Sequence, residues 1–291
     1  MTGFLRLFKC DVRNGVRSTR KTIIVTCGFL LLLILSFYMR IGDMALTDEV
    51  SLAKELVRCG PFSSGDYLAY LLAGKGPWLA SDSEPFKFPA AWMVLFSLFL
   101  YMTLWYPLGD LRGMGTQVLV AGQSRWLWWL SKCLWVATWS IVLIVLLAVV
   151  AAVWAGLRGG DISWVPAGRI EAILSQEPSL RPESVGSVLP FFFCTLAVGA
   201  GLSMFQLALS LFVRPLLSFA ACFSLLFVSI CQCSPCLLGN YLIAMRSSAL
   251  MVSGMSAVAG IALGLAVSAL SALVGGIRFS RIDLLDKEFD T

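Results

Sequence analysis

The sequence predicts an all-α integral membrane protein with six transmembrane helices. Of its 291 residues, 58% are hydrophobic and 13% are charged, whereas soluble globular domains have roughly 45–50% and 25%. Six apolar runs without Asp, Glu, Lys or Arg reach the roughly 17–25 residues that a helix needs to cross a bilayer. They do not alternate between polar and apolar residues, which favours helices over a barrel. Within one membrane domain, 22–277, we expect spans at about 22–39, 88–107, 133–157, 188–213, 216–232 and 251–277.

The first 21 residues predict an amphipathic helix at the cytoplasmic membrane interface. The segment has six Lys and Arg residues and one acid, and basic residues near a span stay on the cytoplasmic side. Six spans then return the tail, 278–291, to the cytoplasm. The alternative is a basic tail that only sets the topology. The apolar face and the basic residues beside it are formed by Phe4, Leu5, Phe8, Arg6 and Lys9.

The external segment 40–87 contains two short helical signals. One begins at Thr47 and ends at Gly60, and the other has Asp66 at its start and Gly74 at its end. Acidic residues in the first turn and glycine after the last are typical of helix ends. We therefore expect a helical hairpin on the outer face. A second external loop, 158–187, is interrupted by prolines and predicts one short helix.

The two connections that flank the fifth span differ in character. Arg214-Pro215 leaves almost no room for a loop and predicts a tight cytoplasmic turn. The segment "CQCSPCLLGNYLIAMRSSALM" is too apolar for a free loop and too interrupted for a span. We expect a short helix that dips into the outer leaflet, where surrounding protein must cover its backbone. An ordinary external loop is the alternative.

The composition excludes several kinds of chemistry. The chain has no histidine, which removes the commonest general base and the usual imidazole zinc sites. It lacks the GxxxxGK[ST] phosphate loop. The spans also lack the ionisable residues expected of an ion-driven carrier. We expect no enzyme activity, no metal or cofactor bound by this chain and no nucleic-acid partner, and any energy for work would come from another subunit.

Four of the nine cysteines are expected on the outer side of the membrane: Cys59, Cys231, Cys233 and Cys236. A disulfide among them is permitted by the oxidising conditions outside the cytoplasm. The Cys-x-Cys-x-x-Cys spacing also suits a soft metal ion, but no fourth ligand is evident. Reduced cysteines that serve only in packing are the remaining alternative.

Small residues recur every four positions in the last span, at Ser256, Gly260, Gly264 and Ser268. Such a stripe lets another helix approach closely in lipid. The partner helix lies either in the same chain or in a second copy.

The connection between the second and third spans ends in "GTQVLVAGQSRWLWWLSK". Its tryptophans suit the headgroup level of the membrane. If the segment is helical after Gly115, its polar residues face an aqueous partner. A simple interfacial loop explains the tryptophans but not the length and polarity of the connection.

Taken together, the six spans, the basic amphipathic amino-terminal helix, the helical first cytoplasmic loop, the minimal second one and the interrupted link after span five resemble the type-2 ABC exporter permeases. More locally, "GTQVLVAGQSRWLWWLSK" and "LLGNYLIAMRSS" look like segments of bacterial permeases in that group that are encoded beside a separate ATPase. Many of those permeases are linked to antimicrobial-peptide export or resistance.

The resemblance implies that the first cytoplasmic loop is a coupling helix that docks on an ABC ATPase in the bacterial plasma membrane. The ATPase would bind ATP and Mg²⁺, and a second permease chain, identical or related, would complete the path for an amphipathic, peptide or lipid-like substrate. Membrane lipids are the remaining partner. The residues implied to face the ATPase, or in the last case to lie at the adjoining membrane boundary, are Asp110, Arg112, Gln117, Gln123, Arg125 and Lys132.

A different class of function is a membrane binding or immunity protein that works without an ATPase. Its external segment, 40–87, would then intercept a toxin or peptide. An intramembrane enzyme has little support, because the chain lacks histidine and the spans lack carboxylates.

Overall fold

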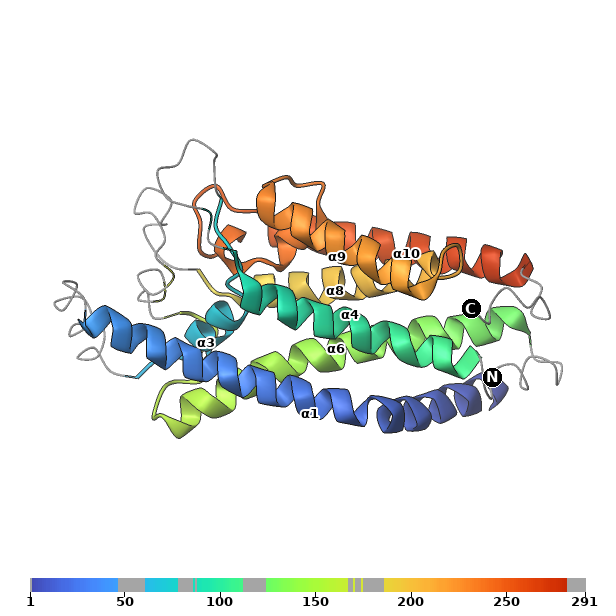
Figure 1. Ribbon diagram of the computed structural model, residues 1–291, viewed down its shortest axis with the longest axis horizontal. Helices are drawn as coiled ribbons and strands as arrows, with labels where there is room; N and C mark the ends of the chain where they lie inside the picture. Colours follow the sequence, from blue (N-terminus) through green and yellow to red (C-terminus); the bar gives the residue numbers. More distant parts are fainter. Residues whose placement is uncertain are drawn as a thin grey trace.

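The fold is an elongated bundle of helices. A computed structural model describes residues 2–46, 61–77, 86, 88–111, 124–166, 170, 174 and 186–281. These residues form seven α-helices and two 3₁₀-helices, and no strand occurs among them. The long helices lie side by side along the long axis of the molecule (Figure 1). The predicted all-α class is confirmed.

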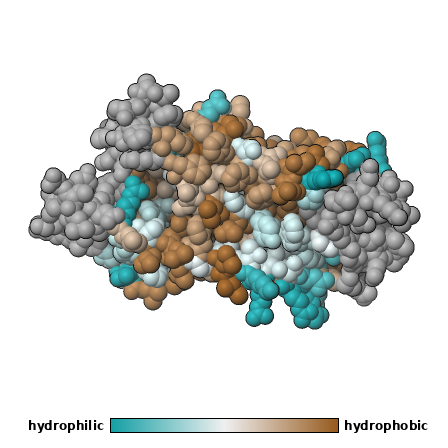
Figure 2. All heavy atoms as spheres, viewed as in Figure 1, coloured by the Kyte–Doolittle hydropathy of each residue, from teal (hydrophilic) through white to brown (hydrophobic). Residues whose placement is uncertain are grey.

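Five helices are long and apolar enough to cross a membrane: α1 (Thr2–Leu46), α4 (Ala90–Leu111), α6 (Arg125–Leu157), α8 (Leu189–Leu209) and α10 (Ala257–Arg281). The fifth expected span corresponds to α9 (Pro215–Cys231), which is apolar but has only 17 residues. Hydrophobic side chains make up most of the middle of the face in Figure 2, and hydrophilic ones lie mainly toward its two ends. The chain is a multi-pass membrane protein.

Helix α1 joins two elements that the sequence pattern separates. The expected interfacial helix, 1–21, and the first span form one helix of 45 residues. No proline interrupts it, and Gly15 packs against the ring of Trp135 in α6, so the backbone continues through the junction. Phe8 is half-buried and Lys9 is exposed, while the side chains of Phe4, Leu5 and Arg6 lie outside the described residues.

The short helix α3 (Ser64–Leu71) fits the second signal in the external segment, whereas the first, 47–60, lies outside the described residues. A capping box starts α3: the Ser63 hydroxyl accepts from the Asp66 amide, and the Asp66 carboxylate accepts from the Ser63 amide. This arrangement satisfies amide groups that a helix start leaves unpaired. The Tyr67 hydroxyl bonds that of Tyr38 in α1, and burial raises the pKa of Tyr67. Helix α3 is thereby fixed to α1.

Two 3₁₀-helices, η2 (Leu238–Leu242) and η3 (Ala244–Arg246), take the place of the single short helix expected after α9. Protein covers their backbone. The amide of Ala244 donates to the Leu72 carbonyl at 2.8 Å, and the indole of Trp92 donates to the Leu242 carbonyl at 3.1 Å. These long-range contacts explain how so interrupted a segment is held in place.

The small-residue stripe of α10 lies partly against α8. A side chain at Gly264 would come within 2.6 Å of the Ala197 backbone, and Gly260 packs against Cys194 and Tyr241. Ser268 is half-buried, and Ser256 is exposed. Gly260 and Gly264 therefore serve packing within the chain.

Candidate functional site

A buried ion-pair cluster joins α1, α4 and α6 close to the end of α4 and the start of α6, on either side of residues 112–123. The Lys132 ammonium lies 2.5 Å from Oδ1 of Asp11 and 2.6 Å from Oδ2 of Asp110. Lys132 is fully buried, and Asp11 is 3% exposed. Each of the three residues comes from a different helix, so the cluster fixes the three helix ends to one another.

Neutral donors and aromatic rings complete this cluster. The hydroxyl of Ser131 donates to Oδ2 of Asp11 at 2.5 Å, and that of Tyr106 donates to Oδ1 at 3.0 Å. The Lys132 ammonium also lies 5.0 Å from the ring centres of Tyr106 and Trp128. Two carboxylates and one ammonium leave a net formal charge of −1, which the hydroxyl donors help to stabilise. The charges are thus enclosed by protein.

The local sequence explains this arrangement. Trp128, Lys132 and Trp135 recur at helical spacing and share one face of α6. Gly15, one turn after Asp11, has no side chain, so α1 can approach the ring of Trp135. Asp11 was not among the predicted site residues. The available signal was a single acid in an otherwise basic helix and a single lysine at the start of a span.

The residues expected to face an ATPase, together with Lys132 at the expected membrane boundary, divide into two groups. Arg112, Gln117 and Gln123 lie outside the described residues, and their contact with an ATPase remains a prediction. The side chains of Asp110 and Lys132 are instead engaged within the chain. Arg125 donates from Nη1 to the Ser280 carbonyl at 3.0 Å, which links the start of α6 to the end of α10.

A second buried charge, Arg246, lies in η3, which contacts α3. It is 1% exposed. Burial lowers the pKa of Arg246. Because its bonds reach the last carbonyls of α9, Arg246 caps that helix. Its acceptors are the carbonyls of Lys75, Gly76, Ser229 and Ile230 and the side-chain oxygen of Asn240.

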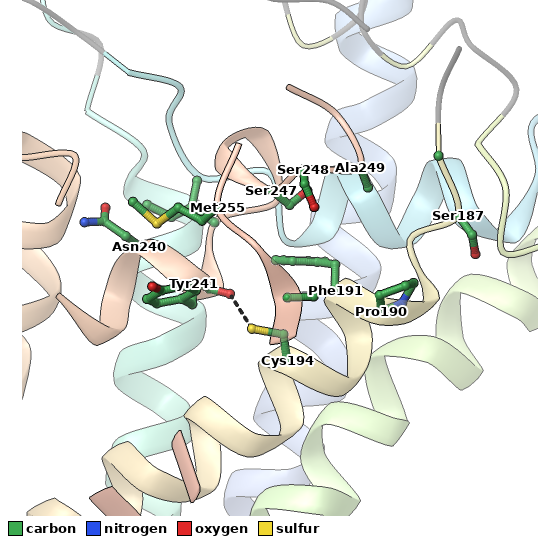
Figure 3. A pocket seen from close by; sticks show the side chains of 13 residues that line it. Ser187, Pro190, Phe191, Cys194, Asn240, Tyr241, Ser247, Ser248, Ala249 and Met255 are labelled. Atoms are coloured by element: carbon green, nitrogen blue, oxygen red, sulfur yellow. Dashed lines mark hydrogen bonds between the residues drawn. The ribbon is translucent and has the colours of Figure 1, made fainter. Parts of the chain in front are cut away.

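A pocket of about 160 Å³ lies between the start of α8 and the 240–257 segment (Figure 3). Phe191 and Met255 supply apolar walls, and Tyr241 and Ser248 supply polar groups. The Cys194 thiol donates to the Tyr241 carbonyl across 3.9 Å. Burial raises the pKa of Tyr241, so its phenol stays neutral. Among the lining residues that the structure describes there is no Asp, Glu, Lys or Arg, and this part of the pocket suits an uncharged group.

The cysteines of the described ranges are all free. Cys231, Cys233 and Cys236 are exposed at the end of α9, and no disulfide joins them to one another. Cys59 lies outside the described residues, so a bridge to it remains a prediction. Within the described part of the chain, no group of three or more Cys, Asp or Glu side chains is placed to hold a metal ion.

The chain matches one protein family, and the function of that family is unknown. Residues 69–285 match the model of a family described as "Protein of unknown function (DUF2705)". No curated protein and no solved structure matches the chain.

Proposed function

Because the chain belongs to the DUF2705 family, whose function is unknown, we infer its role from its own residues and propose that it is the permease subunit of an ATP-driven exporter. A separate ABC ATPase binds ATP and Mg²⁺ and docks on the 112–123 loop. A second permease chain completes the transport path in the bacterial plasma membrane. The observation that carries this proposal is the buried cluster of Asp11, Asp110 and Lys132 beside that loop.

The cluster supports a coupling role because it resists independent movement of the helices at the loop. Asp110 lies in the last turn of α4, two residues before the loop, and Lys132 lies in the second turn of α6. Separating them would leave charges buried without partners, which is strongly unfavourable. A displacement of residues 112–123 would therefore move α4, α6 and α1 together.

Contacts of α6 with α10, and of α10 with α8, extend this coupling to other helices. Arg125, at the start of α6, bonds the carbonyl of Ser280 near the end of α10. Helix α10 packs closely on α8 through Gly264. A loop attached in this way would convert movement of an ATPase into movement of most of the bundle.

The absence of charged residues along the middle of the described helices supports a proposal about the substrate class. The longest apolar stretches of α6, α8 and α10 contain no Asp, Glu, Lys or Arg. Small and apolar side chains suit an amphipathic peptide or a lipid-like molecule better than a free ion. We propose export of such a substrate, with resistance to antimicrobial peptides as the physiological setting.

The test is co-purification of an ATPase with the tagged chain after extraction from its host in mild detergent. We expect an ABC ATPase to co-elute. Replacing Gln117 and Gln123 together by Glu should lower its recovery by about tenfold, because charge placed in a docking surface disrupts complementarity. The matched control is Arg158→Glu, which changes the formal charge by the same amount at the exposed carboxyl end of α6.

Two results would overturn the proposal. One is the lack of any ATPase across several gentle extractions, which would favour a binding protein that acts through its external segment. The other is equal loss of the ATPase in the control and in the loop variant, because the loop would then have no special part in docking.

A further inference from the structure

The end of α9 presents three thiols on the surface. Cys231, Cys233 and Cys236 are exposed, whereas Cys133, Cys194 and Cys222 are buried. A buried cysteine is explained by packing as a small apolar residue. That explanation does not apply to three exposed thiols within six residues.

The backbone of this thiol loop, residues 231–236, is held in one conformation. Nδ2 of Asn240 donates to the carbonyls of Gln232 at 3.0 Å and Ser234 at 2.8 Å. The amide of Leu237 donates to the Ser234 carbonyl at 3.2 Å and closes a turn. Cys233 precedes this turn, and Cys236 is its third residue. The turn keeps the Cα atoms of Ser234 and Leu237 within about 7 Å and reverses the chain between Cys233 and the residues that follow Cys236.

A buried positive charge lies beneath the loop. Arg246 bonds the carbonyl of Ile230, directly before Cys231, and the side-chain oxygen of Asn240. All of its hydrogen-bond acceptors are carbonyl oxygens, so no carboxylate in the described part of the chain neutralises it. A fixed positive charge near thiols stabilises the negative charge on sulfur when a thiol reacts. The thiol loop therefore has accessible sulfur atoms, a hydrogen-bonded backbone and a nearby positive charge that favours a negatively charged sulfur.

We propose that the thiol loop is a thiol–disulfide exchange site, in which Cys233 and Cys236 interconvert between a dithiol and a disulfide by reaction with low-molecular-weight disulfides. One cysteine loses its proton to water, and its sulfur attacks the external disulfide. This forms a mixed disulfide and releases one thiolate. The second cysteine, also deprotonated, attacks the protein sulfur of the mixed disulfide and releases the second thiolate. The two released thiolates take up the two protons, and two electrons pass from the protein to the external disulfide.

Oxidation of the thiol loop would affect the segments that its hydrogen-bond partners contact. Asn240, which holds the loop backbone, also lines the pocket of Figure 3 together with Tyr241. Arg246 further bonds the carbonyl of Lys75, beyond the end of α3. A disulfide would fix the loop against these groups. This inference does not depend on the proposed ATPase partner.

The test uses the full-length protein in detergent with oxidised glutathione as the probe. After timed exposure, free thiols are blocked with N-ethylmaleimide, and the state of each cysteine is read by peptide mass spectrometry. Cys10, an exposed thiol on α1, is the internal reference. We expect Cys233 and Cys236 to become linked about tenfold faster than Cys10 forms a mixed disulfide, because the charge and the second thiol both favour exchange.

Variants separate the site from general thiol reactivity. In Cys236→Ser, Cys233 should stop at a mixed disulfide with glutathione, while Cys222→Ser, which alters a buried cysteine, should leave the linkage unchanged. The proposal is overturned if Cys233 and Cys236 react no faster than Cys10. It is equally overturned if the wild-type loop yields only mixed disulfides, or if the new bond links Cys231 in place of Cys233 or Cys236.

Discussion

Lys132 shows how one buried side chain can hold several elements together. Its ammonium has two carboxylate partners and two aromatic neighbours, and no part of it reaches the surface. The sequence indicated a lysine at the edge of a span but not its partners. Asp11 lies 121 residues away, and only the packing of α1 on α6 brings the two together.

Removing the ammonium should therefore destabilise the fold. Lys132→Met leaves the buried Asp11 and the half-buried Asp110 without a counter-charge, and we expect a loss of about 3–5 kcal/mol in the free energy of unfolding. The measurement is thermal unfolding of the purified protein in detergent. Adding Asp11→Asn to Lys132→Met should restore part of the loss. If Lys132→Met unfolds at the wild-type temperature, the ion pairs make no contribution to stability.

The helices show what hydrophobic patterning can and cannot locate. α8 and α9 begin within one residue of the expected spans, at Leu189 and Pro215. α6 begins at Arg125, eight residues before its expected span, because a helix continues beyond the apolar stretch that marks a membrane crossing. The two 3₁₀-helices were not predictable from local signals, since contacts with Leu72 and Trp92 hold them in place.

The contact between α8 and α10 gives a prediction about helix packing. Gly264→Val places a side chain against the Ala197 backbone, which cannot move without separating the two helices. We expect a loss of about 1–3 kcal/mol, as for other overpacked interiors. Thermal unfolding should show a lower midpoint. Ala266→Val, on the exposed side of the same helix, is the control, and equal midpoints for the two variants would contradict this reading.

At the scale of the whole molecule, α1 begins and α10 ends at the same end of the bundle (Figure 1). The contacts of Lys132 with Asp11 and of Arg125 with Ser280 also lie at that end. The expected six spans would likewise place the two chain ends on one side of the membrane. The sequence could not supply the neighbours of each helix, because apolar faces in lipid are chemically alike.

This arrangement predicts the membrane topology. Single cysteines added in a cysteine-free background before residue 2 and after residue 281 should react with an impermeant maleimide from the same side of the membrane. A cysteine at Ser187, which lies before α8, should react from the other side. If the site after residue 281 reacts from the same side as Ser187, and opposite to the site before residue 2, α9 does not cross the membrane.

The unbroken course of α1 has a mechanical consequence. At about 1.5 Å per residue, its 45 residues extend for about 68 Å, whereas a bilayer with its headgroups is roughly 40–45 Å thick. The helix is longer along its axis than the membrane is thick, and it bends toward its amino-terminal part (Figure 1), with Asp11 near one end and Tyr38 toward the other. If neighbouring helices hold the middle of α1 in place, a tilt of α1 displaces its two ends in opposite directions. A movement at the ion pairs of Asp11, at one end of α1, would then displace the Tyr38–Tyr67 contact with α3 at the other end.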